Sequence, residues 1–143
     1  MGGAPKYRRM NVIALYDASG ERLLLCRRSK DPYKGLLNFV GGKVESGERG
    51  LDSAYRELYE ETGIGRGEVA LRRLMDLTFA IPKIRLEVFF GQLRADARVR
   101  GEENELVWRS VGENFYDASR FAGDGNLGVI VAAARAYRSS LPE

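Results

Sequence analysis

The chain has 143 residues, 44% of them hydrophobic and 30% charged, with a net charge of +3 and no histidine. This size and composition predict one globular domain over residues 1–143, and no apolar run approaches the roughly 20 residues of a membrane span. A histidine general base, a Ser-His-Asp triad and histidine metal ligands are therefore excluded. The small net charge gives no reason to expect a nucleic-acid polymer as partner.

The first residues and the cysteine usage suggest where the protein resides. The segment MGGAPKYRRM lacks the apolar stretch of a secretory signal peptide. The single cysteine, Cys26, forbids an internal disulfide and suits a reducing compartment, so we expect a cytoplasmic protein. Cys26 follows three leucines, which predicts a small buried side chain.

Strand patterns dominate the first part of the chain. Residues 7–17 and 21–29 are apolar runs joined by Ala-Ser-Gly, which predicts a hairpin of two paired strands. After a turn cluster, residues 36–40 predict a short strand that ends at the glycine pair 41–42. Over residues 49–62 the apolar spacing becomes helical.

The second part repeats this combination of strands and one helix. Residues 71–81 and 84–93 predict a second hairpin, turning near Pro82, and residues 105–111 predict another strand. Residues 127–140 are rich in alanine and precede a proline, which predicts a final helix. The order of elements indicates an α+β fold in which helices cover a mixed sheet.

The first predicted helix carries clustered acidic residues. At about 100° per residue, Glu57, Glu60 and Glu61 fall within one arc beside the apolar stripe, and neighbours three or four apart repel by roughly 0.2–0.5 kcal/mol. Two interpretations are open: a solvated charged face, or carboxylates that gather with glycine carbonyls around Mg²⁺ or Mn²⁺. The predicted core stripe comprises Leu51, Ala54, Tyr55 and Leu58.

A longer pattern around this helix favours the metal site. Gly42, five residues, Glu48, seven residues and then the run from Arg56 to Ile64 resemble the complete Nudix box, with every fixed position filled. The flanking strands and final helix are also similar to the Nudix fold, a mixed sheet sandwiched between helices. The resemblance implies a metal-dependent hydrolase that cleaves a diphosphate linked to another moiety, usually a nucleoside.

The resemblance also implies roles for the residues of the box. The Gly42 carbonyl, Glu57, Glu60 and Glu61 would hold the metal ion, and Glu57 or Glu60 would act as general base. Arg56 would pair with Glu48 and hold the carboxylates in place. Family members often use a further carboxylate from a later loop; the candidates here are Glu102, Glu103 and, less favoured, Glu105, with a solvated acidic loop as the alternative.

Substrate residues are expected outside the box. In similar proteins an arginine at the place of Arg28 reaches the phosphates, and Lys43 is a second candidate; for Arg28 the alternative is a solvated charge at a strand end. The segment LNFVGGKVE resembles MutT-like enzymes that cleave 8-oxo-dGTP, where asparagines at the places of Asn38 and Asn126 read the purine. Asn126 could instead cap a helix.

Other Nudix substrates remain open, namely ADP-ribose, a dinucleoside polyphosphate or a nucleotide sugar. A sensor that binds a nucleotide without cleaving it is disfavoured, because this chain keeps every glutamate of the box. Nudix enzymes are often dimers, and the apolar hairpin predicted over residues 79–90 could supply the interface of a homodimer.

Overall fold

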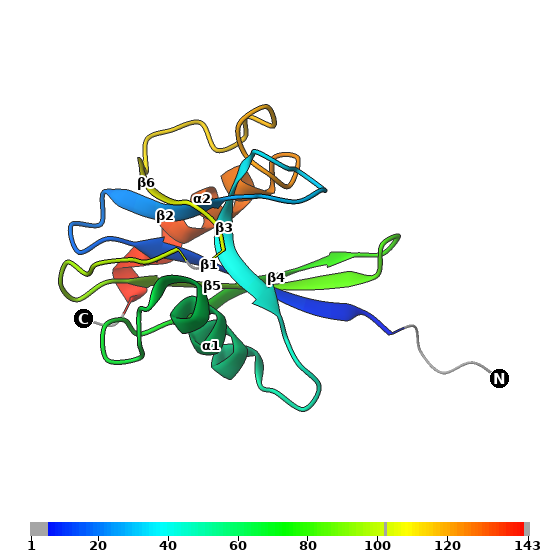
Figure 1. Ribbon diagram of the computed structural model, residues 1–143, viewed down its shortest axis with the longest axis horizontal. Coiled ribbons are helices and arrows are strands. Elements are labelled where there is room, and N and C mark those ends of the chain that lie inside the picture. The colour runs from blue at the N-terminus through cyan, green and yellow to red at the C-terminus, as the bar shows by residue number, and fades with distance from the viewer. Residues whose placement is uncertain (1–5, 102, 142–143) are drawn as a thin grey trace.

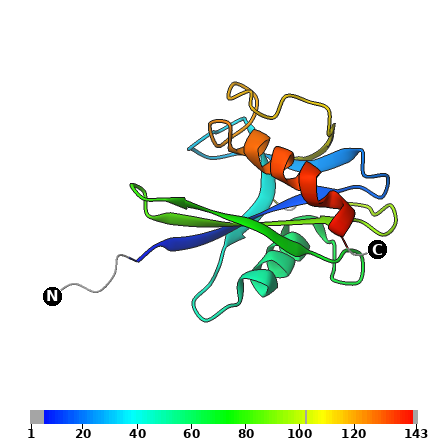
Figure 2. The same cartoon turned by 180° about the vertical axis from the view of Figure 1, so that it is seen from behind.

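A mixed β-sheet lies between two helices in the computed structural model, which describes residues 6–101 and 103–141. Helix α1 covers one face of the sheet and α2 the other (Figures 1 and 2). Among the described residues, no helix is both long and apolar enough to cross a membrane. The elements are β1 (Arg8–Tyr16), β2 (Arg22–Arg27), β3 (Leu37–Lys43), α1 (Gly50–Thr62), β4 (Arg72–Phe79), β5 (Ile84–Gln92), β6 (Leu106–Ser110), α2 (Asn126–Tyr137) and a short 3₁₀ turn (Arg138–Ser140).

The strands follow the order β4-β5-β1-β3-β2-β6. The predicted hairpin of β4 and β5 is confirmed, because these strands pair antiparallel from Phe79↔Ile84 onward. The first predicted hairpin is confirmed at its turn, where β1 and β2 pair antiparallel at Tyr16↔Leu23, but this pairing does not extend along the two strands. The two strands diverge beyond that point and β3 lies between them, while the other edge of β1 pairs parallel with β5 along its whole length.

The glycine pair also differs from the prediction. Gly41 and Gly42 do not form a loop after β3 but are part of it, opposite Val12 and Asn11 of β1. A Cβ at Gly41 would overlap the backbone oxygen of Asn11, so glycine allows the two strands to approach. The end of β3 that leads toward α1 is therefore a strand paired with β1 and not a flexible connection.

Alternation along the strands divides the core between two layers. On β1, Ile13 and Leu15 pack toward α1, whereas Val12, Ala14 and Tyr16 pack toward α2. On α1, the predicted core positions Ala54 and Leu58 are fully buried, but Leu51 is 39% exposed. Gly50 packs against the buried Glu87 at the start of α1, which turns Leu51 outward and Ser53 inward.

Candidate active site

The acidic side chains come from the C-terminal half of α1. The helix ends at Thr62, and the following residue, Gly63, has a left-handed φ of 81° and donates its N–H to the Tyr59 oxygen at 2.9 Å. Leu58 anchors this half in the core. Helical spacing therefore presents Glu57, Glu60 and Glu61 along one side of the anchored helix.

These glutamates border a cavity of about 140 Å³ between α1 and the loop before β6. Glu103 reaches the same cavity, whereas Glu105 turns away and pairs with Arg27 at 3.2 Å. Glu102, the other predicted loop carboxylate, lies outside the described residues. The lining residues are Cys26, Glu57, Glu60, Glu61, Glu103, Asn104 and Leu106.

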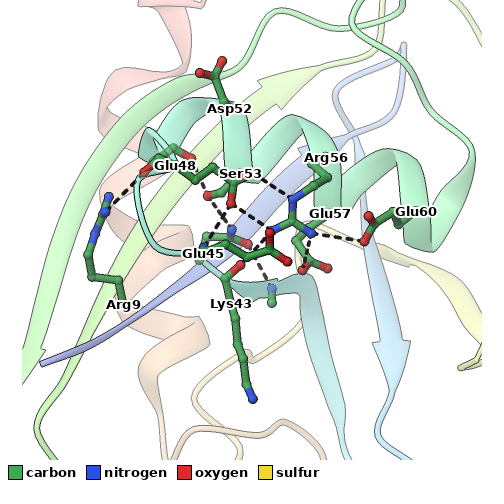
Figure 3. Close-up of polar contacts among 12 residues, drawn as sticks. Arg9, Lys43, Glu45, Glu48, Asp52, Ser53, Arg56, Glu57 and Glu60 are labelled. Carbon is green, nitrogen blue, oxygen red and sulfur yellow. Dashed lines mark hydrogen bonds and ion pairs between the residues drawn. The ribbon is translucent and has the colours of Figure 1, made fainter.

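Arg56 fastens the acidic cluster (Figure 3). Its Nε and Nη2 donate to the two Glu48 oxygens at 2.8 and 3.0 Å, a bidentate pair. Its Nη1 reaches Glu57 at 3.1 Å and Glu60 at 3.2 Å, and Nη2 also donates to the Lys43 oxygen at 2.9 Å. One guanidinium thus connects the loop before α1, strand β3 and the helix.

Within the acidic cluster, the environment of Glu61 disfavours its charged form. Burial, with further repulsion from Glu57 and Glu103, raises the pKa of Glu61 to about 7, although the Gly41 backbone amide opposes the shift. In the part of the chain that the structure describes, no three acidic or thiol groups converge tightly enough to enclose an ion as they lie. The carboxylate oxygens nevertheless suit Mg²⁺ or Mn²⁺, and a cation would offset the crowded negative charge.

The Glu48–Arg56 pair predicts a pH dependence of stability. Hydrogen bonding from Arg56 lowers the pKa of Glu48 to about 2, below its ordinary value of 4.5. The folded state thus holds fewer protons there than the unfolded state, so the stabilisation is lost as pH falls from about 4.5 toward 2. Acid titrations of unfolding should show a shallower decline for Glu48→Gln than for wild type.

Asp96→Asn, at an exposed loop position, is the matched control for this titration. It should decline like the wild type, since Asp96 lies outside the Arg56 cluster. Parallel curves for Glu48→Gln and Asp96→Asn would contradict the contribution assigned to the pair.

The two predicted phosphate-binding side chains have different surroundings. Arg28 directly follows β2, and its Nε donates to the Pro32 oxygen at 2.6 Å. Burial raises the pKa of the thiol of Cys26, which lines the cavity, to about 11. The positive charge of Arg28 lies near enough to oppose this shift. The Lys43 side chain points away from the carboxylates in Figure 3, and only its backbone oxygen contacts the cluster.

The two predicted base-reading amides belong to different elements, Asn38 to β3 and Asn126 to α2. Asn38 pairs in register with Cys26, so it occupies the sheet face that borders the cavity. Its Oδ1 accepts the Phe39 N–H at 2.9 Å, and its amide N–H groups donate to none of the other described residues. Asn126 is the first residue of α2, and the helix cap is Gly125 without a side-chain bond, so the capping alternative is wrong.

The sequence patterns did not predict three buried polar residues between α1 and the sheet. Asn11 and Ser53 are 1% and 0% exposed and hydrogen-bond to each other at 2.9 Å. Glu87 is 1% exposed and pairs with Arg9 and Arg73, each at 2.7 Å. Both Asn11 and Glu87 interrupt apolar strand runs, and that interruption was the signal available in the sequence.

The NUDIX domain family matches residues 6–123. The CTP pyrophosphohydrolase of Escherichia coli (strain K12) is 33% identical over 104 residues, covering 69% of this chain and 73% of that protein. The chain belongs to the Nudix hydrolase family.

Solved structures confirm the fold. The Ap4A hydrolase of C. elegans has a TM-score of 0.75 at 18% identity, and MutT from Aliivibrio salmonicida or Vibrio cholerae has 0.68 at 22%. In both comparisons the match covers 92% of this chain and 99% of the other. The predicted α+β Nudix fold, a mixed six-stranded sheet with helices on both faces, is thus correct.

Proposed function

We propose that this protein is a Mg²⁺-dependent pyrophosphohydrolase that cleaves nucleoside triphosphates to the monophosphate and pyrophosphate. The observation that carries the proposal is the gathering of Glu57, Glu60, Glu61 and Glu103 around one cavity. The relationship to a CTP pyrophosphohydrolase over 73% of its length supports the same reaction class. Mn²⁺ is the expected substitute for Mg²⁺.

In this proposal the glutamates and Arg56 have different roles in the reaction. Glu57, Glu60 and Glu61 would hold the ion, with Glu103 and the Gly42 carbonyl as further donors. The ion supplies neutralisation of phosphate charge and acidification of bound water. Glu57 or Glu60 would accept the proton from the attacking water, and Arg56 keeps both carboxylates in position at 3.1 and 3.2 Å.

The decisive experiment is a substrate panel with Mg²⁺ whose products are identified by mass. It should include purine, oxidised purine and pyrimidine triphosphates, ADP-ribose, dinucleoside polyphosphates and nucleotide sugars. Release of pyrophosphate and a monophosphate supports the proposal, whereas preferred cleavage of ADP-ribose contradicts the triphosphate assignment. Tight binding of a nucleotide without turnover would instead indicate a sensor.

For the base, we favour an oxidised purine such as 8-oxo-dGTP, with CTP as the second candidate. The purine assignment depends on Asn38, whose amide N–H groups have no acceptor in the part of the chain that the structure describes and can donate to a carbonyl on the base edge. The CTP alternative depends on the 33% identical relative. The two are separated by measuring which triphosphate has the higher kcat/KM.

Replacing Asn38 tests the base-reading role. One lost hydrogen bond of this kind corresponds to about 1–3 kcal/mol, or roughly 5- to 150-fold in kcat/KM. Asn38→Ala should therefore reduce discrimination between purine and pyrimidine triphosphates and leave Mg²⁺ affinity unchanged. Asn114→Ala, in an exposed loop, is the control. An equal loss of activity on every triphosphate would refute base reading by Asn38.

A further inference from the structure

A buried amide connects the two elements that meet at the acidic cavity. Asn11 lies on β1 on the same face as Ile13 and Leu15, which belong to the apolar core under α1. Burying an amide among apolar side chains costs free energy unless its polar atoms are hydrogen-bonded. Asn11 is 1% exposed and has a partner at each end of its amide.

The oxygen end of this amide holds strand β3. Gly42 donates its backbone N–H to Asn11 Oδ1 at 3.0 Å. Gly42 also packs directly against Glu57, because a Cβ on this glycine would overlap the Glu57 carboxyl group. The position of Gly42 therefore limits where the Glu57 carboxylate can lie.

The nitrogen end holds helix α1. Asn11 Nδ2 donates to Ser53 Oγ at 2.9 Å, and Ser53 Oγ donates to the Gly50 oxygen at 2.6 Å. Ser53 is 0% exposed and lies one helical turn before Glu57 (Figure 3). The Asn11 side chain therefore bonds both to Gly42, which the Glu57 carboxyl group contacts, and to the helix turn that precedes Glu57.

We propose that Asn11 is a positioning residue for the metal-binding carboxylates, acting through Gly42 and Ser53 on Glu57. A hydrophobic residue at position 11 would fill the same core but would leave the Gly42 N–H without this acceptor. The inference rests on the proposed function, since it assigns Asn11 to the site that would bind the metal ion.

The positioning role of Asn11 is tested by titrating the metal-free protein with Mn²⁺ in the absence of nucleotide and measuring the heat of binding by calorimetry. Asn11→Ala should weaken Mn²⁺ binding by roughly 10- to 100-fold, the usual consequence of losing a residue that orients a metal ligand. In turnover assays, kcat should fall and the Mg²⁺ requirement should rise, while KM for the nucleotide at saturating metal stays near its wild-type value.

Two controls separate positioning from general stability. Val131→Ala lowers stability from the opposite core, under α2, and should bind Mn²⁺ like the wild type. Ser53→Ala removes the helix contact but keeps the Gly42 bond, so its Mn²⁺ affinity should fall less than that of Asn11→Ala. Asn11→Ser, whose hydroxyl is too short to span both partners, replaces Asn11→Ala if that variant does not fold.

Wild-type Mn²⁺ affinity in Asn11→Ala or Asn11→Ser would overturn the inference. Equal losses in Ser53→Ala and Asn11→Ala would also overturn it, because the Gly42 bond would then contribute nothing. Failure of the proposed function looks different: the wild-type protein would hydrolyse no nucleotide in the panel, while the Mn²⁺ titration would still report on Asn11.

Discussion

Replacing Glu57 or Glu61 with glutamine is expected to lower kcat by several orders of magnitude while the fold is retained. Both side chains border the cavity, and an amide keeps their shape but cannot supply the negative charge that binds the ion. A thousandfold loss corresponds to about 4 kcal/mol of transition-state stabilisation. Steady-state assays over a range of Mg²⁺ concentrations measure the effect.

Stability should respond in the opposite direction at Glu61. Burial and the neighbouring Glu57 disfavour its charged form and raise its pKa to about 7, so glutamine removes an electrostatic cost in the metal-free protein. Glu61→Gln is thus expected to melt no lower than the wild type without metal, and to gain less stability when Mg²⁺ is added.

Glu68→Gln, an exposed acid outside the cavity, is the control and should behave like the parent. Turnover of wild-type protein in excess EDTA would refute the metal assignment. So would normal kcat in both variants of the cavity, Glu57→Gln and Glu61→Gln.

Loss of Arg56 should lower both stability and activity. Its guanidinium makes charge-assisted bonds to Glu48, Glu57 and Glu60, so Arg56→Ala leaves three carboxylates crowded without their shared counter-charge. The Arg56 side chain is only 26% exposed, and a hydrogen bond to a charged group contributes about 1.5–3 kcal/mol, so a clear drop in melting temperature is expected. Thermal unfolding and kcat/KM at saturating Mg²⁺ are the measurements.

Two substitutions sharpen this test. Arg56→Lys keeps the charge but cannot form the bidentate pair with Glu48, so its effects should be intermediate. Arg66→Ala also removes a salt bridge of α1, to Asp52 at 2.7 Å, but that pair is about half exposed and should contribute little. If Arg56→Ala melts and turns over like Arg66→Ala, the clamp does not act as described.

The elements themselves could be predicted because their signals are local. Helical spacing and the glycine stop define α1 within one residue, and alternating apolar runs locate all six strands. The fixed spacing of the acidic residues then places Glu57, Glu60 and Glu61 on one side of that helix before any tertiary contact is known. Their roles toward a metal ion stay predictions.

Pairing and orientation depend on contacts between distant parts of the chain. The short turn between β1 and β2 predicted a hairpin, yet beyond that turn β1 pairs with β3 on one edge and with β5 on the other. Periodicity alone gave Leu51 a core position, although the packing of Gly50 on Glu87 rotates it outward. The hydrogen bonds of Asn11 could not be predicted from the sequence either, because its partners are a glycine N–H and a serine on other elements.

The parallel pairing of β1 with β5 also determines when the protein can mature during synthesis. Arg9 and Glu87, which pair across these strands, are 78 residues apart in the chain. During synthesis, α1 is therefore complete before β5, the parallel partner of β1, leaves the ribosome. Such non-local closure slows folding. We expect α1 to complete its core contacts only after β5 has joined the sheet, because Phe89 of β5 belongs to the apolar core under this helix.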